Sequence, residues 1–319
     1  METIGTPSLW LVFAGVVILA LLADLVLMRH GGPHKVGFKE AAWWSLGWVA
    51  LALTFNAWLW WHTGQRFGAE AGNEIGMEFL TGYLVEKALA VDNIFVFLML
   101  FGYFAVPEAQ RQRALVIGIL GALALRALLI FAGALLLAKF HWILYLFGAF
   151  LLLSGIKMWR SAGEEPNLDD NPVLRWLTAH VPFLRRYVGS ALWVGSGSRR
   201  KFTPLFIVVV MLGIIDVIFA VDSIPAIFAI TTDPFVVLTS NVFAVLGLRA
   251  MFFLLQGMAE RFHLLPYGLA LVLAFIGAKM LLIDLYKIPI LVALGAVALI
   301  IGATIALSLL QPARREADR

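Results

Sequence analysis

The sequence predicts an all-α, polytopic membrane protein with nine transmembrane helices, whose core is two inverted three-helix repeats. Composition is the first indication, since 62% of the 319 residues are hydrophobic and 14% are charged, against about 45–50% and about 25% in soluble domains. The second is nine long apolar runs, because a hydrocarbon core of about 30 Å needs about 20 helical residues. The third is that the chain repeats part of its own sequence.

The expected spans are continuously apolar, which favours helices over the alternating strands of a membrane barrel. In chain order they cover 8–28, 41–61, 77–101, 114–137, 141–159, 203–230, 236–256, 264–284 and 288–310. The first span lacks a basic n-region and a small-residue cleavage site, so we expect it to be retained rather than removed as a signal peptide.

Five parts of the chain follow from these spans. Residues 1–76 hold two N-terminal helices, 77–160 the first repeat, 161–202 a cytoplasmic linker, 203–285 the second repeat, and 286–319 a last helix with a short cytoplasmic tail. The linker is polar and contains three prolines that interrupt helices. Its apolar piece VLRWL is too short to cross the membrane and favours an interfacial helix.

The loop charges predict the orientation. With the N-terminus outside, sixteen Lys and Arg residues fall on the inside and three on the outside. Because cytoplasmic loops carry the excess of these residues, we expect a periplasmic N-terminus and a cytoplasmic C-terminus. The net charge of +4 is spread between apolar segments, so it is interpreted as a topology signal and nucleic acid is not an expected partner.

The repeat is clearest where AVDNIF at 90–95 matches AVDSIP at 220–225. LRA at 125–127 likewise matches LRA at 248–250, and GIKM at 155–158 matches GAKM at 277–280. Each copy contains three spans, so the second copy enters the membrane from the opposite face. Inverted repeats of this kind are typical of secondary transporters, although a channel or a structural duplication would share the symmetry.

Four acids lie inside the repeated spans, namely Glu86, Asp92, Asp216 and Asp222. A charge at the bilayer centre costs from about 2.5 to more than 10 kcal/mol, so such residues face a cavity or a partner. A hard divalent cation such as Mg²⁺, Ca²⁺ or Mn²⁺ would supply that partner, because these ions prefer oxygen ligands. The chain has no cysteine and its six histidines lie in loops or at span ends, which disfavours a soft metal.

The spacing limits how these acids share an ion. Residues six apart on one helix differ by about 9 Å in height and about 120° in direction, so one ion cannot bind both acids of one span. In antiparallel spans, Glu86 lies level with Asp222 and Asp92 with Asp216, or a slide of one turn brings Asp92 opposite Asp222. The sequence leaves both registers open.

Three neighbouring residues complete the candidate metal site. Asn93 and Ser223 stand beside the two motif aspartates and would add neutral oxygen ligands. Pro225 is expected to bend its helix and to deprive the carbonyl of Val221 of its hydrogen bond.

Arg126 and Arg249 occupy matched positions deep in the second span of each repeat. They would balance the acids, either as purely structural ion pairs or as counter-charges when no metal is bound. Two membrane aspartates are also the arrangement of an intramembrane aspartyl protease, but the sequence that ends at Asp216 is GIID rather than the Gly-x-Gly-Asp that such enzymes carry, so we expect no enzyme activity. Asp24 is interpreted as an end-of-helix residue.

The segments TGYLVEKALAVDNIFVF and DVIFAVDSIPAIFAITTDPF, with GLRAMFFLL, resemble the TerC family, and the resemblance runs from about residue 8 to residue 310. It implies a bacterial inner-membrane protein with a fold similar to LysE-like transporters that exports manganese for metal homeostasis or under alkaline stress. The family's acidic positions fall on the four acids named above. Many relatives have a glutamate where this chain has Gly213.

Together these features predict a secondary transporter that exports Mn²⁺, with Ca²⁺ or Mg²⁺ as alternative ions. The expected coupling is exchange for protons. The expected partners are the ion and the lipid bilayer, and no bound cofactor is expected. A membrane interaction partner that assists metal delivery to exported proteins or to another exporter is the alternative.

Overall fold

The computed structural model is a bundle of helices. It describes residues 3–31, 37–140, 142–162, 175–176, 182, 184, 186–195, 200–256 and 262–310. In chain order the elements are α1 (Pro7–Gly31), α2 (Phe38–Phe67), α3 (Ala69–Tyr103), α4 (Glu108–Lys139), α5 (Ile143–Ser161), β1 (Trp193–Val194), β2 (Lys201–Phe202), α7 (Pro204–Phe228), α8 (Pro234–Leu246), α9 (Leu248–Gln256), α10 (Leu265–Leu281) and α11 (Ile290–Leu310).

Every predicted span coincides with helix in this structure. Among the described residues, six helical stretches are long and apolar enough to cross a membrane, and α10 is a shorter apolar helix. The prediction of an all-α membrane protein is therefore confirmed, whereas nine transmembrane helices remain a prediction. α2 and α3 are longer than a bilayer requires, at 30 and 35 residues, and both carry polar residues that lower their hydropathy.

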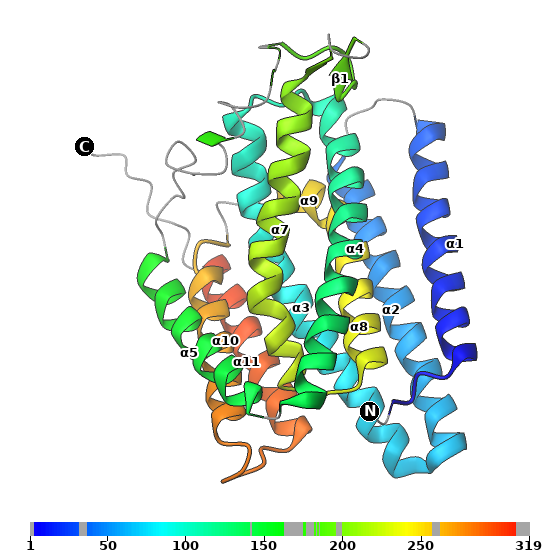
Figure 1. The fold of residues 1–319 in the computed structure, drawn as a ribbon, viewed down its shortest axis with the longest axis vertical. Helices are drawn as coiled ribbons and strands as arrows, with labels where there is room; N and C mark the ends of the chain where they lie inside the picture. The colour runs from blue at the N-terminus through cyan, green and yellow to red at the C-terminus, as the bar shows by residue number, and fades with distance from the viewer. Residues whose placement is uncertain are drawn as a thin grey trace.

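The long helices pass up and down the bundle in alternation (Figure 1). α3 and α5 run in one direction and α4 in the other, and α7, α8–α9 and α10 each run opposite to their counterparts in the first half. The N-terminus lies at the lower end in this view, and the antiparallel β1–β2 pair lies at the upper end. The core side chains of α3, α7 and α8 pack together between these ends.

One predicted span is interrupted. The run 236–256 forms two helices, α8 and α9, separated at Gly247.

On the opposite face of the core, small residues let α5 and α10 approach closely. A Cβ at Gly155 would lie 2.7 Å from the carbonyl oxygen of Ala270, and one at Gly277 would lie 2.6 Å from the backbone nitrogen of Leu152.

Within the described residues of the linker, β1 pairs with β2, with Trp193 opposite Phe202, which was not predicted. Thr203 is the N-cap residue of α7, and its backbone nitrogen donates to the carbonyl of Leu192 over 2.9 Å. Most of the segment predicted as an interfacial helix, and the predicted tail beyond Leu310, lie outside the described residues.

Candidate cation cavity

A buried arginine joins two of the predicted acids. Arg126 of α4 is fully buried and lies between α3 and α7. Its Nε donates to Asp216 Oδ2 over 3.0 Å and its Nη2 donates to Asp216 Oδ1 over 2.9 Å. Its Nη1 donates to Glu86 Oε1. One guanidinium therefore binds a carboxylate from each repeat, and the bidentate geometry with Asp216 is the strong form of this pair.

The group formed by Glu86, Arg126 and Asp216 carries more negative than positive charge when both acids are ionised. Asp216 uses both oxygens on Arg126, whereas Glu86 uses only one. The other, Oε2, is buried and has no hydrogen-bond partner among the described residues. A buried acceptor without a partner is costly, so this oxygen is suited to a cation.

Glu86 also lines a cavity of about 720 Å³, which is formed mainly by α3, α5 and α7. The cavity also contains both motif aspartates and the two neutral residues predicted beside them. The polar residues in its lining are Glu86, Asp92, Asn93, Ser154, Lys157, Ser161, Asp222 and Ser223.

Three residues of this lining, from two helices, each carry a buried oxygen without a partner among the described residues. Besides Glu86 Oε2, these are Asn93 Oδ1 and Ser223 Oγ, each buried and unpartnered within the described part of the chain. Asp222 lies beside Ser223, and its Oδ1 accepts a hydrogen bond of 2.9 Å from Ser154 Oγ. Carboxylate, amide and hydroxyl oxygens together are the ligand types that hard cations prefer.

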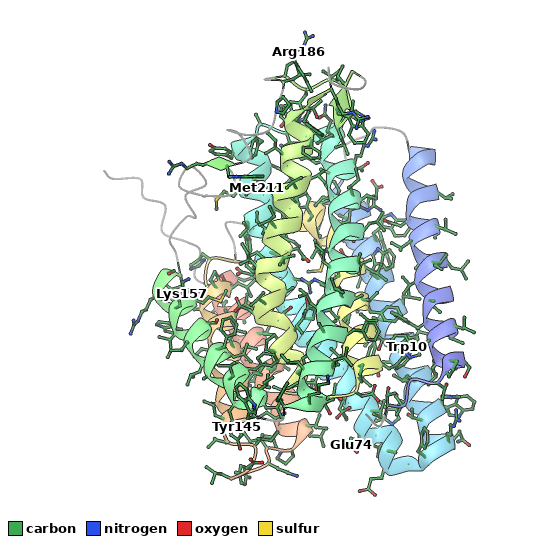
Figure 2. The ribbon with its side chains drawn as sticks, in the orientation of Figure 1. Trp10, Glu74, Tyr145, Lys157, Arg186 and Met211 are labelled. Atoms are coloured by element: carbon green, nitrogen blue, oxygen red, sulfur yellow. The ribbon has the colours of Figure 1, made fainter. Side chains whose placement is uncertain are left out.

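The cavity is open on two sides. Lys157 and Ser161, at the C-terminal end of α5, are exposed, and Figure 2 shows Lys157 on the outer edge of the upper half of that helix. Between α5 and α7 the wall is formed by Leu153 and Ile218, which are 65% and 56% exposed. The cavity therefore opens at the side of the bundle, along the outer edge of α5.

The structure brings the acids together differently from either predicted register. Glu86 lies opposite Asp216, with Arg126 between them, and Asp92 shares the cavity with Asp222. Asp216 instead lines a separate small pocket of about 10 Å³ on another side of the core. Within the described residues, no three acidic or histidine side chains converge closely enough to hold a metal ion, so a joint four-acid site remains a prediction.

Arg249 does not contact the four acids as the sequence suggested. Its Nη2 donates instead to Asp24 Oδ1 of α1. Asp24 is thus a buried ion-pair partner rather than a helix-end residue, with 8% of its surface exposed.

Three contacts in or beside the cavity were not predicted from the sequence. Ser154 donates to Asp222, Lys157 belongs to the cavity lining, and Lys87, next to Glu86, donates through Nζ to the carbonyl of Ala244 over 3.1 Å. Ser154 precedes the repeated GIKM motif, which was the available signal. Lys87 had none, because its acceptor exists only where α8 ends before Gly247.

Pro225 and Gly213 lie in α7 as predicted. Pro225 has no N–H for the carbonyl of Val221, a residue of the cavity lining. Gly213 is nine residues from Asp222, which on an α-helix is about half a turn away in direction. A Cβ at Gly213 would meet no atom within 4 Å, so the missing glutamate does not remove a carboxylate from the cavity side of α7.

A bundle of long apolar helices around an acid-lined cavity defines a multi-pass integral membrane protein. The chain belongs to the integral membrane protein TerC family, whose model matches residues 71–316.

Its curated relatives include Alx proteins, named as proposed membrane-bound redox modulators. The chain is 51% identical to Alx of Salmonella typhi over 97% of its own length and 96% of the relative, and 53% identical to Alx of Escherichia coli over 93% and 92%. It is 45% identical to an uncharacterised membrane protein of Myxococcus xanthus over 98% and 96%. No solved structure matches the chain significantly.

Proposed function

We propose that this protein is a secondary transporter that exports Mn²⁺ across the bacterial inner membrane in exchange for protons, and that it serves metal homeostasis or alkaline stress. The observation that carries the proposal is a cavity whose lining includes Glu86, Asn93 and Ser223, each with a buried oxygen that has no partner among the described residues. Asp92 and Asp222 add further carboxylates to the same lining. A dication bound there would give some of these oxygens the partner that they lack.

The donor set favours a hard divalent ion. Every polar residue in the cavity lining other than Lys157 offers a carboxylate, amide or hydroxyl oxygen, and such oxygens suit Mn²⁺, Mg²⁺ and Ca²⁺. Mn²⁺ is the ion that the TerC resemblance implies. A softer metal would prefer sulfur or imidazole, and no histidine belongs to the cavity lining.

The proposed topology has nine spans in two inverted repeats, a periplasmic N-terminus and a cytoplasmic C-terminus. The opposed directions of α3–α5 and α7–α10 support it, as does the concentration of basic residues on one side. Figure 2 shows Lys157 near the middle of the height of the bundle and Glu74 near its lower end, so in this topology the opening beside Lys157 lies on the cytoplasmic side of Glu74. The conformation described here is then the one that receives the ion from the cytoplasm.

Proton exchange follows from ligand chemistry. A carboxylate must lose its proton to bind a metal, so binding at Asp92 and Asp222 releases protons and metal release allows them to return. Arg126 binds Glu86 and Asp216 when the cavity contains no cation. Its positive charge then compensates these acids in the core.

Purified protein in liposomes tests this function. We expect saturable Mn²⁺ flux that an imposed pH gradient accelerates in the direction opposite to proton flow. A tenfold excess of Mg²⁺ or Ca²⁺ added as a competitor ranks the ions. Flux indistinguishable from that of protein-free liposomes would contradict transport. Flux that does not respond to the pH gradient would contradict proton coupling.

The second candidate is a membrane interaction partner that assists metal delivery, and the name of the Alx relatives as redox modulators favours a role other than transport for them. This chain has no cysteine, so a thiol relay along it is excluded. The liposome measurement separates the two candidates, since an interaction partner would move no Mn²⁺ on its own.

A further inference from the structure

The two arginines of the repeat are equivalent in sequence but not in structure. Arg126 and Arg249 both belong to an LRA motif. Arg126 is fully buried and uses three nitrogens on two acids. Arg249 contacts Asp24 through one nitrogen, and its buried Nε has no partner among the described residues. One arginine is therefore fully bound and the other is held more loosely.

In an inverted-repeat transporter, alternating access arises when one repeat moves against the other, so each half adopts in one state the arrangement that its partner adopts in the other. The repeat aligns Glu86 with Asp216 and Arg126 with Arg249. When the two halves exchange arrangements, Glu86 and Asp216 remain a pair, whereas Arg249 takes the place of Arg126 beside them. This step rests on the proposed transport function.

The second half contains a joint beside its arginine. α4 is continuous through Arg126, whereas the equivalent segment is divided at Gly247, two residues before Arg249. Lys87, next to Glu86, donates to the carbonyl of Ala244 at this division, and a Cβ at Gly247 would lie 2.7 Å from Lys87 Nζ. The helix break two residues before Arg249 thus contacts α3, the helix that carries Glu86.

We propose that Arg126 and Arg249 alternate as the buried counter-charge of Glu86 and Asp216. Arg126 fills this role in the conformation seen here, with the cavity open beside Lys157, and Arg249 fills it in the opposite conformation. Asp24 is a positioning residue that binds Arg249 while Arg126 is engaged. The acid pair therefore keeps one cation in both states, so that the conformational change does not leave two carboxylates unpaired in the membrane.

Cysteine labelling tests the exchange, because the chain has no cysteine of its own. A Met158→Cys reporter lies half-buried in the cavity lining, and its maleimide reaction rate in purified protein reports how open the cavity is. Asp24→Asn releases Arg249 to compete with Arg126, so we expect the rate to fall at least threefold. Adding Arg249→Met to Asp24→Asn removes the competitor and should restore the parental rate.

Two comparisons make the result decisive. A Ser190→Cys reporter in an exposed loop should react at the same rate in all variants, which excludes general unfolding. Arg249→Met alone should label like the parent and lose Mn²⁺ flux, because the opposite state lacks its cation. Parental labelling in Asp24→Asn, equal slowing in the double variant, or normal flux in Arg249→Met would overturn the exchange.

A separate measurement in the same labelling experiment tests the proposed Mn²⁺ transport function. Mn²⁺ should slow the labelling of Met158→Cys in the parent protein, since the ion occupies the same cavity. Absence of that protection would count against the metal site, while the comparison of Asp24→Asn with its double variant would still decide whether the arginines exchange.

Discussion

Asp92→Asn and Asp222→Asn should each reduce Mn²⁺ flux in liposomes by about 100-fold or more, since even outer-shell changes at metal sites cost about 10–100-fold. Both side chains line the cavity whose lining also includes Glu86, Asn93 and Ser223, each with a buried oxygen that has no partner among the described residues. The amide keeps the size of the side chain and removes the charge that attracts the cation. Folding should be unaffected, because neither aspartate belongs to the buried ion pairs.

Glu74→Gln is the matched control. Glu74 is an exposed acid on α3, the helix that carries Asp92, and lies at the end of the bundle away from Lys157. It does not line the cavity, so its loss should leave flux within about twofold of the parent. Equal losses in Glu74→Gln and Asp92→Asn would indicate a general surface-charge effect, and full flux in both cavity variants would remove the site assignment.

Arg126→Met should destabilise the protein by about 3–5 kcal/mol, the range expected when one partner of a buried ion pair is removed. The change leaves Glu86 and Asp216 buried with no cation between them. The measurement is the midpoint of thermal unfolding in detergent, with Arg66→Met as the control at an exposed position on α2.

A further variant tests whether Arg126→Met loses stability through unpaired charge or through lost packing. Adding Glu86→Gln and Asp216→Asn to Arg126→Met removes the charges that were left unpaired, so most of the stability should return even though the arginine is still absent. A triple variant as unstable as Arg126→Met would show that the volume of the arginine, rather than its charge, stabilises the core.

The sequence located the acids because a charge in an apolar run is conspicuous and because the repeat marks it twice. Asp92 and Asp222 line one cavity with Asn93 and Ser223, although the pairing of Glu86 with Asp216 through Arg126 fits neither predicted register. The place of Asp216 was not predictable. It depends on the rotation of α7 about its axis, which is decided by packing against α4 and not by any local pattern.

The partners of the basic residues were beyond sequence reasoning for a related cause. Asp24 and Arg249 are 225 positions apart, and Lys87 and Ala244 are 157 apart, so neither pair leaves a short-range signal. The division at Gly247 lies in a run that is predominantly apolar, and hydropathy therefore predicted one continuous span. In contrast, helix class and approximate span positions depend on local composition and were predicted well.

Binding of Mn²⁺ to purified protein, followed by the electron paramagnetic resonance signal of the free ion, tests the central claim most directly. Parent protein should remove Mn²⁺ from solution saturably, and the Asp92→Asn, Asp222→Asn double variant should remove little. If that double variant binds Mn²⁺ as the parent does, or if the parent binds none, the oxygen-lined cavity is not the metal site.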